Sequence, residues 1–223
     1  MRVLLASPSY GPVDPICREA IDVAIMSAAN HGTHWMGTSY PDRMFWTEAR
    51  NNCVEACLGM PECEGIVWVD SDMVPKPETF WRLMDMVEKQ GFDFLSGIYH
   101  ARRGHMKPVF FHYNKKLDIY SQAYVYEKNV VFPVDAVGFG ICFTSRKALE
   151  KIASLKCFNK DEGGWFPDQR WSKWSEDITF GNLAMKAGIR CYLDTGNIAG
   201  HMGILKIVWP EDYWATFPGV QTP

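Results

Sequence analysis

The 223-residue chain lacks a strong excess of charge of either sign. It has 23 Lys and Arg against 26 Asp and Glu, for a formal net charge of −3. Because affinity for nucleic acid rests mainly on Lys and Arg contacts to phosphates, this balance argues against a large basic nucleic-acid surface. There is also no apolar run long enough to span a bilayer, and the apolar part of the opening MRVLLASPSYG is too short for a signal peptide. We therefore expect a soluble, cytoplasmic protein without a transmembrane segment.

A paired cysteine pattern is missing as well. The seven cysteines are an odd number and are scattered along the chain. Cys53, Cys57 and Cys63 form C-x3-C-x5-C, which does not have the spacing of a zinc knuckle. We interpret the cysteines as small buried thiols in a reducing compartment.

Aromatic residues, in contrast, are abundant. They make up 14% of the chain and include nine tryptophans. A core alone rarely needs so many, so we expect some of them to form a binding surface. The length suits one large domain with a substantial core. Since no internal repeat, low-complexity tract or linker is found, we predict a single domain over residues 1–223.

The first hundred residues alternate strand and helix patterns. Strands are expected at 3–6, 33–37, 65–69 and 94–98. Helices are expected from Pro15, over 47–58, and from Pro77 to just before Gly91. This alternation predicts a mainly parallel sheet with helices on both faces.

The pattern changes in the second half. Strands are expected at 109–113, 119–126, 130–134 and 140–144, as an antiparallel insertion or edge. They are followed by a helix over 145–153, a helix that starts at 175–177 and has Phe180, Leu183, Ala184 and Ala187 on its apolar face, and a strand at 189–193. The predicted fold class is therefore α/β, with a mainly parallel sheet flanked by helices and a small antiparallel portion.

Asp70-Ser71-Asp72 stands where the strand Gly65-Ile-Val-Trp-Val ends. Ligands of open α/β sheets bind beyond the carboxyl ends of the strands. Two carboxylates at such a place offer hard oxygen ligands to Mg²⁺ or Mn²⁺. The alternative is a solvated turn in which an aspartate caps the next segment, punctuated by Pro75 and Pro77.

Two further polar features follow. Glu176 and Asp177 begin a predicted helix, where acidic residues are favoured by the exposed amides, and Asp177 is also a candidate general base. His201 stands between Gly200 and Gly203 in Gly-His-Met-Gly, after the last expected strand. It is either a packed histidine or a metal ligand, for which the glycines leave room.

The order of these motifs resembles the GT-A glycosyltransferases. Asp-x-Asp follows a mid-chain strand, Glu-Asp comes about a hundred residues later, and His-x-Gly comes last. Ala49-Arg50-Asn51-Asn52 and Val137-Gly138-Phe139-Gly140 support the likeness. It spans essentially the whole chain and is closest to the family-2-like branch, whose members transfer a sugar from a nucleotide diphosphate donor.

This resemblance implies roles for individual residues. It places Asp70 near the donor ribose or sugar, and Asp72 and His201 at a divalent metal, Mn²⁺ or Mg²⁺, with Asp70 as a further candidate ligand. It makes Asp177 the catalytic base of an inverting enzyme and puts Glu176 at the acceptor or the helix amides. The donor-binding residues it implies are Ser7, Pro8, Tyr10 and Arg50. The first loop departs from the family pattern, because it reads Ser-Pro-Ser-Tyr-Gly-Pro where Pro-x-Tyr-Asn is commoner.

The implied chemistry is consistent with the rest of the sequence. A nucleoside diphosphate leaving group needs a cation, and the chain lacks a Gly-x4-Gly-Lys-Ser/Thr phosphate loop, so a metal at Asp72 and His201 would neutralise it. A base on the face opposite the leaving group gives inversion through an oxocarbenium-like state. The expected partners are a UDP- or GDP-sugar donor and a saccharide or other hydroxyl acceptor.

Two further segments have either a binding or a structural role. Rings just before Glu176 either stack on the acceptor or anchor the loop to the core, namely Trp165, Phe166, Trp171 and Trp174. Arg102 and Arg103, with His105 and Lys107, either bind phosphate or form a solvated basic turn.

Two other functions compete with the glycosyltransferase. A nucleotidyltransferase also uses carboxylate-held Mg²⁺, but it favours a glycine-rich and basic first loop, and residues 7–12 contain no Lys or Arg. The other is a non-catalytic protein that binds nucleotides or carbohydrates. The joint presence of Asp72, Asp177 and His201 argues against it.

Overall fold

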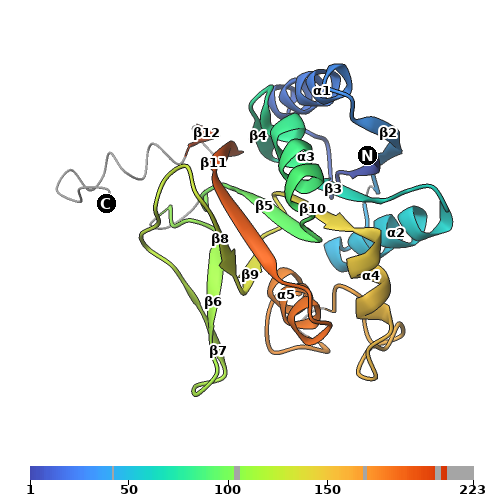
Figure 1. Cartoon of the computed structure of the whole chain (residues 1–223), viewed down its shortest axis with the longest axis vertical. Helices are drawn as coiled ribbons and strands as arrows, with labels where there is room; N and C mark the ends of the chain where they lie inside the picture. Colours follow the sequence, from blue (N-terminus) through green and yellow to red (C-terminus); the bar gives the residue numbers. More distant parts are fainter. Residues whose placement is uncertain (42, 103–105, 168–169, 204–206, 210–223) are drawn as a thin grey trace.

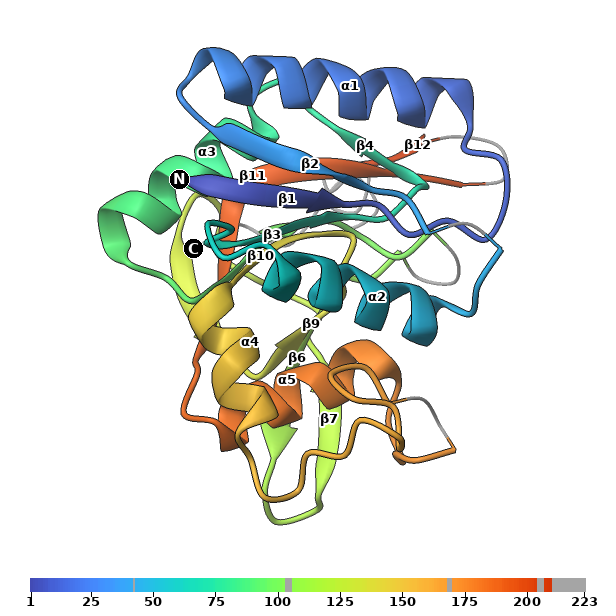
Figure 2. The ribbon, with the colours of Figure 1, turned by 90° about the vertical axis from the view of Figure 1, so that its right-hand side faces the viewer.

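A central β-sheet is covered by helices on both faces (Figures 1 and 2). The computed structural model describes residues 1–41, 43–102, 106–167, 170–203 and 207–209. Helices α1 (Pro15–Asn30) and α3 (Thr79–Gln90) pack on one face, and α2 (Trp46–Gly59), α4 (Arg146–Ala153) and α5 (Glu176–Lys186) pack on the other. Within the described ranges, none of the helices combines the length and the apolar character needed to span a bilayer.

The order of strands in the central sheet is β12-β11-β5-β10-β3-β1-β2. These strands are β1 (Arg2–Ala6), β2 (His34–Ser39), β3 (Gly65–Val69), β5 (Phe94–Ile98), β10 (Ile141–Ser145), β11 (Cys191–Met202) and β12 (Ile207–Val208). β1 runs parallel to β2 and β3, and β11 runs parallel to β5, whereas β10 is antiparallel to both of its neighbours. The protein therefore has a mixed, Rossmann-like α/β fold with a mostly parallel central sheet, as the sequence predicted.

Smaller strands complete the architecture. β4 (Met73–Pro75) and β8 (Val131–Val134) pair antiparallel with β11. A separate antiparallel sheet has the order β7-β6-β9, with β6 at Phe110–Asn114, β7 at Ile119–Gln122 and β9 at Ala136–Val137. This is the small antiparallel portion that was expected in the second half of the chain.

Local signals in the sequence account for the helix boundaries. Pro15 occupies the first turn of α1, and the Asp14 carboxylate accepts the N–H of Ile16 at 2.8 Å. The Ser145 hydroxyl caps α4 by accepting the N–H of Ala148 at 3.0 Å. Helix α3 ends at Gly91, whose φ of 70° is the left-handed conformation that glycine adopts without strain.

The hydrophobic core has one cluster on each face of the sheet. Val3, Val67 and Phe143 point toward α1 and α3, while Leu4, Trp68 and Cys142 point toward α2, α4 and α5. Neighbouring residues of one strand thus serve opposite faces, and both faces are dry. This two-sided burial explains why the central strands read as continuous apolar runs rather than as alternating ones.

The structure corrects three expectations for the second half of the chain. β10 lies at the centre of the main sheet, not in an antiparallel insertion or edge. β7 ends at Gln122 instead of 126, and β11 extends through His201, which was expected to follow the strand. A shift of register between Asp194 and Ile198 interrupts the regular pattern of β11. For this reason the sequence pattern does not predict the second half of the strand.

Candidate functional site

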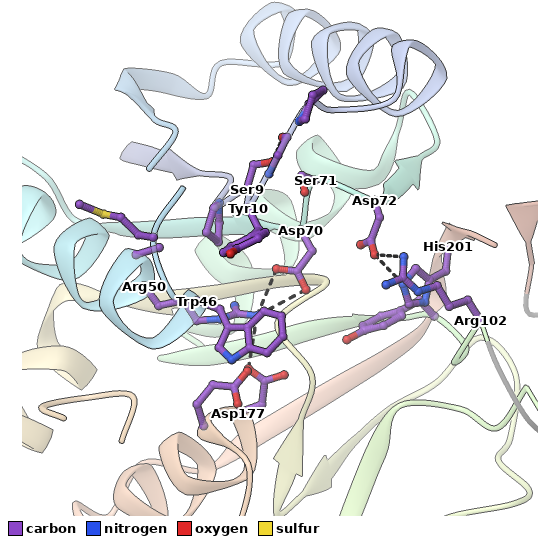
Figure 3. A pocket seen from close by; sticks show the side chains of 17 residues that line it. Ser9, Tyr10, Trp46, Arg50, Asp70, Ser71, Asp72, Arg102, Asp177 and His201 are labelled. Carbon is purple, nitrogen blue, oxygen red and sulfur yellow. Dashed lines mark hydrogen bonds and ion pairs between the residues drawn. The ribbon is translucent and has the colours of Figure 1, made fainter. Parts of the chain in front are cut away.

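A pocket of about 480 Å³ opens beyond the ends of β1 and β3 (Figure 3). Its wall consists of the loop after β1, the start of α2, the turn after β3, the start of α5 and the end of β11. These elements are far apart in the sequence and converge because the parallel strands end at the same edge of the sheet. Asp70, Asp72, Asp177 and His201 all line this pocket, as their motifs predicted.

Arg50 links two of the predicted carboxylates on the floor of the pocket. Its Nη2 lies 3.1 Å from Oδ1 of Asp70 and 3.4 Å from Oδ1 of Asp177. Only 5% of the Arg50 side chain is exposed, and its guanidinium lies over the rings of Phe139 and Phe166 at 5.0 and 5.7 Å. A buried cation held between two acids fixes the strand end at Asp70 and the helix start at Asp177 relative to each other.

The burial of this cluster shifts its proton equilibria. Burial raises the pKa of Asp177 to about 7 against the opposing effect of Arg50, and the charges of Glu176 and Asp70 act in the same direction as burial. Burial also raises the pKa of Asp70, although Arg50 opposes it. Burial lowers the pKa of Arg50, but the carboxylates outweigh that effect and hold the pKa above its ordinary value. Asp177 thus takes up and releases its proton near neutral pH, beside a permanent cation.

Asp72 and His201 form a second cluster on the other side of the pocket (Figure 3). Oδ2 of Asp72 lies 3.3 Å from Nε2 of His201 and 2.5 Å from Nη1 of Arg102. Burial raises the pKa of Asp72, but the hydrogen bond and charge of His201 and the charge of Arg102 outweigh it, so the pKa lies below its usual value. Asp72 is therefore an ionised carboxylate over the whole physiological pH range.

The orientation of His201 suits it to bind a cation. Its Nδ1 lies 2.9 Å from the carbonyl oxygen of His100, to which it donates its proton. Nε2 is the ring nitrogen that faces the Asp72 carboxylate, and in the neutral imidazole it is the nitrogen that can bind a cation. A metal-ligating histidine is commonly oriented by just such a bond from its other nitrogen to a carbonyl.

The donor atoms fit a partial site for Mg²⁺ or Mn²⁺. Two ligands at a right angle, each about 2.1 Å from one ion, lie about 3.0 Å apart, close to the 3.3 Å between Asp72 Oδ2 and His201 Nε2. Within the described part of the chain, no group of three acidic, His or Cys side chains is placed to hold a metal, and the Asp70 carboxylate bonds to Arg50 instead. Mg²⁺ commonly uses one or two protein ligands and completes its shell with water and substrate phosphate.

The structure brings some of the other predicted residues to the pocket and not others. Pro8, Tyr10 and Glu176 line it. Ser7 does not: it is buried at the end of β1, where its N–H donates to the carbonyl of Ser39 at 2.9 Å, and Ser9 lines the pocket in its place.

The four aromatic residues expected at the acceptor also lie elsewhere. Trp165 and Phe166 are buried in the core, where Nε1 of Trp165 donates to the carbonyl of Leu149. They anchor the loop, as the alternative interpretation had it. Trp171 and Trp174 line a neighbouring hollow of about 290 Å³, and the Trp174 ring packs edge-on against Tyr120.

Sequence reasoning missed several residues of the pocket wall. Trp46, at the start of α2, is 59% exposed and lines the pocket. It supplies the aromatic face that was expected from the loop before Glu176. Tyr99 packs edge-on against His201, with ring centroids 5.6 Å apart. The sequence feature that reflects the position of Tyr99 is the pair Gly138 and Gly140. A Cβ at Gly138 would lie 2.0 Å from the Tyr99 side chain, and a Cβ at Gly140 would lie 2.6 Å from it, so both positions require glycine.

The basic segment after β5 also has residues inside and outside the pocket. Arg102 lines the pocket and pairs with Asp72, so it is part of the site. Lys107 lies against Tyr124, with Nζ 2.6 Å from the phenolic oxygen. Arg103 and His105 lie outside the described residues.

Comparison with known proteins supports the fold. No family model and no curated protein matches the chain. Among solved structures, the crystal structure of A197 from STIV matches it with a TM-score of 0.59, covering 94% of each chain at 20% sequence identity. A likeness at this identity shows a shared architecture of sheet and helices and is silent on activity.

Proposed function

We propose that this chain is a glycosyltransferase that moves a sugar from a nucleotide diphosphate donor to a hydroxyl acceptor, with inversion at the sugar carbon. The observation that carries the proposal is the placement of two acid clusters in one pocket. One is Asp177 with its cation Arg50, and the other is the Asp72–His201 pair, which lines the same pocket. A titrating base and a site for a diphosphate-bound cation are the two parts that such a transfer requires.

Asp72 and His201 are the residues that would hold Mn²⁺ or Mg²⁺. When bound, the ion supplies positive charge to the diphosphate leaving group. Arg102, which pairs with Asp72, adds a cationic side chain on the same side of the pocket. The donor base would lie against the loop after β1, where Pro8 and Tyr10 face the pocket.

Asp177 is the proposed base. With a pKa raised to about 7, it is basic enough to accept a proton from an acceptor hydroxyl and is largely ionised just above neutrality. The N–H of Phe139 lies 3.4 Å from its Oδ2, and Arg50 faces its Oδ1, so the carboxylate is held from two sides. The acceptor would enter past Trp46 and Glu176, which line the same mouth.

Calorimetric titration with UDP and with GDP, each with and without Mn²⁺, tests the donor half of the proposal. We expect one of the nucleotides to bind only with the metal, and Asp72→Asn to weaken that binding at least tenfold. Asp85→Asn is the matched control, because Asp85 is an exposed carboxylate on α3 that pairs with Lys89. Metal-independent binding, or equal binding by both variants, would contradict the assignment and favour a non-catalytic nucleotide-binding protein.

Asp177→Asn tests the catalytic half. A missing general base typically costs 10²- to 10⁴-fold in rate, so we expect kcat to fall by about that factor while nucleotide affinity stays within threefold. In the unsubstituted enzyme kcat/KM should rise with pH up to about 7 and then level off, because Asp177 must be ionised to accept the proton. Donor turnover is measured by nucleotide release, and the anomeric configuration of the product by NMR. If Asp177→Asn keeps most of its turnover, Asp177 is not the base.

A further inference from the structure

Two cysteines lie side by side at the end of α2 that is remote from the pocket. The Cys57 thiol donates to Sγ of Cys63 at 3.3 Å, and the Cys63 thiol lies 3.3 Å from the carbonyl oxygen of Gly65. Cys57 is in the last turn of α2 and Cys63 stands two residues before β3. Both side chains are buried, at 0% and 1% exposure.

The turn between them is held in shape by Arg146 from α4. Its guanidinium donates to four carbonyl oxygens of this turn, at distances from 2.9 to 3.4 Å, those of Cys57, Leu58, Met60 and Cys63. These bonds position the backbone of both cysteines, so that the two sulfur atoms face each other. The sulfurs need to approach by only about 1.2 Å to reach disulfide length.

The two thiols are chemically unequal. The hydrogen bond from Cys57 lowers the pKa of Cys63 against the effect of burial, and the charge of Arg146 acts in the same direction as the hydrogen bond. The same hydrogen bond, together with burial, raises the pKa of Cys57. Cys63 is therefore the nucleophile of the pair, and Cys57 is the thiol that remains protonated.

We infer that Cys57 and Cys63 form a redox pair that hydrogen peroxide converts into an internal disulfide between the end of α2 and the entry to β3. The Cys63 thiolate attacks one oxygen of the peroxide, the O–O bond breaks, and the leaving hydroxide takes a proton to become water. Cys63 is now a sulfenic acid. Cys57 then loses its proton and attacks Sγ of Cys63, the S–O bond breaks, and a second water leaves. Two thiols have lost two electrons and one peroxide has gained them.

The turn that joins the two cysteines lies at the protein surface. Gly59, Pro61 and Glu62 in the covering turn are exposed, and peroxide is little larger than water. A local opening of this turn, without global unfolding, suffices to admit it. The disulfide would link the end of α2 to the start of β3. The candidate pocket lies at the opposite ends of these two elements, where Arg50 and Asp70 are found. This inference therefore does not depend on the proposed activity.

The test uses the full chain with the exposed Cys157 replaced, Cys157→Ser, so that this thiol does not contribute. The folded protein is treated with peroxide, unfolded in iodoacetamide, and digested with a protease that cleaves after glutamate. Cleavage after Glu55, Glu62 and Glu64 puts Cys57 and Cys63 on different fragments. We expect two of the six remaining thiols to be lost and fragments 56–62 and 63–64 to be joined. Before alkylation, the intact mass of the oxidised chain should be about 2 Da lower than that of the untreated chain, because disulfide formation removes two hydrogens.

Single replacements test the asymmetry. In Cys57→Ser the sulfenic acid of Cys63 has no thiol to resolve it, so dimedone should label Cys63. In Cys63→Ser, Cys57 should stay a thiol at the same peroxide dose. Cys17→Ser, a buried cysteine on α1, is the matched control and should cross-link like the parent. If all six thiols survive a dose that fully oxidises Cys157 in the unsubstituted chain, or if the bridge joins another pair, the inference is overturned; nucleotide binding is not part of this readout.

Discussion

Arg50 is the residue on which the candidate site depends most, because it is the cation between two partly buried acids. Replacing it by Met, an unbranched apolar side chain without the guanidinium, leaves Asp70 and Asp177 facing each other uncompensated. We expect Arg50→Met to lower the free energy of unfolding by about 3 kcal/mol at pH 8, the usual cost of removing one partner of a buried ion pair. Urea denaturation measures this loss.

The sign of the pH dependence follows from the carboxylates. Burial already raises the pKa of Asp70 and of Asp177, and the loss of Arg50 raises both further. Between the ordinary aspartate pKa and these raised values, the folded variant binds more protons than the unfolded one, so its stability increases as the pH falls. The deficit of Arg50→Met should therefore shrink between pH 8 and pH 5.

Arg18→Met is the matched control for this prediction. Arg18 is an exposed arginine that pairs with Asp22 one helical turn away, and removal of such a pair costs less than about 1 kcal/mol. A deficit of equal size at both pH values for Arg50→Met would show that Arg50 acts through packing against Phe139 and Phe166, not through the acids.

At the scale of single residues, the sequence identified the polar centre of the pocket but not its walls. Asp70, Asp72, Asp177 and His201 were found because strand ends and helix starts place polar side chains at predictable points. Ser7, Trp165 and Phe166 were assigned to the site and are buried in the fold instead. The side to which a loop residue points depends on tertiary contacts, such as the hydrogen bonds of Asn51 to the backbone of 163–166, and these leave no periodic pattern in the sequence.

Between β9 and β10, two glycines shape the pocket by admitting a tyrosine ring. A Cβ at Gly138 would lie 2.0 Å from the hydroxyl oxygen of Tyr99, and no shift of the far end of that ring is available because the side chain is 5% exposed and packed. We expect Gly138→Ala to cost about 1–3 kcal/mol of unfolding free energy, the usual range for overpacking. Thermal or urea unfolding measures it.

A double-mutant cycle isolates the cause. Tyr99→Phe removes the hydroxyl that the new methyl group meets first, so Gly138→Ala should cost less in the Tyr99→Phe background than alone. Gly11→Ala is the control, because a Cβ at Gly11 meets no atom within 4 Å. Additive losses in the cycle would mean that Val109, the next neighbour of that Cβ, and not Tyr99, sets the requirement for glycine.

At the scale of secondary-structure elements, regular patterns were predicted well and interrupted ones were not. The strand expected at 94–98 is β5 to the residue, and α3 ends before Gly91 as expected. β11 was truncated because its register shifts at 194–198, and β4 was missed because it has three residues with a proline at its end. Both irregular strands shape the candidate site, since their pairing places His201 opposite Met73, next to Asp72.

For the whole molecule, the sequence indicated the class of fold but not the place of β10. Alternating strands and helices imply a doubly covered parallel sheet, but strand order is decided by packing among residues distant in the chain. β10 joins β3 to β5, and so it links the half of the sheet formed by β1, β2 and β3 to the half that contains β11. From this position we expect β10 to couple the unfolding of the two halves.

A buried hydrogen bond at this junction gives the last prediction. Nε1 of Trp68 on β3 donates to Oγ1 of Thr144 on β10 at 2.9 Å, and both side chains are fully buried. Thr144→Val keeps the shape but leaves the indole N–H without an acceptor, so the free energy of unfolding should fall by about 1–3 kcal/mol. Thr38→Val on the exposed side of β2 should change it by less than about 0.5 kcal/mol. Because β10 contacts both halves, the fluorescence and circular-dichroism transitions should shift together; if they separate, the two halves of the sheet unfold independently and β10 does not couple them.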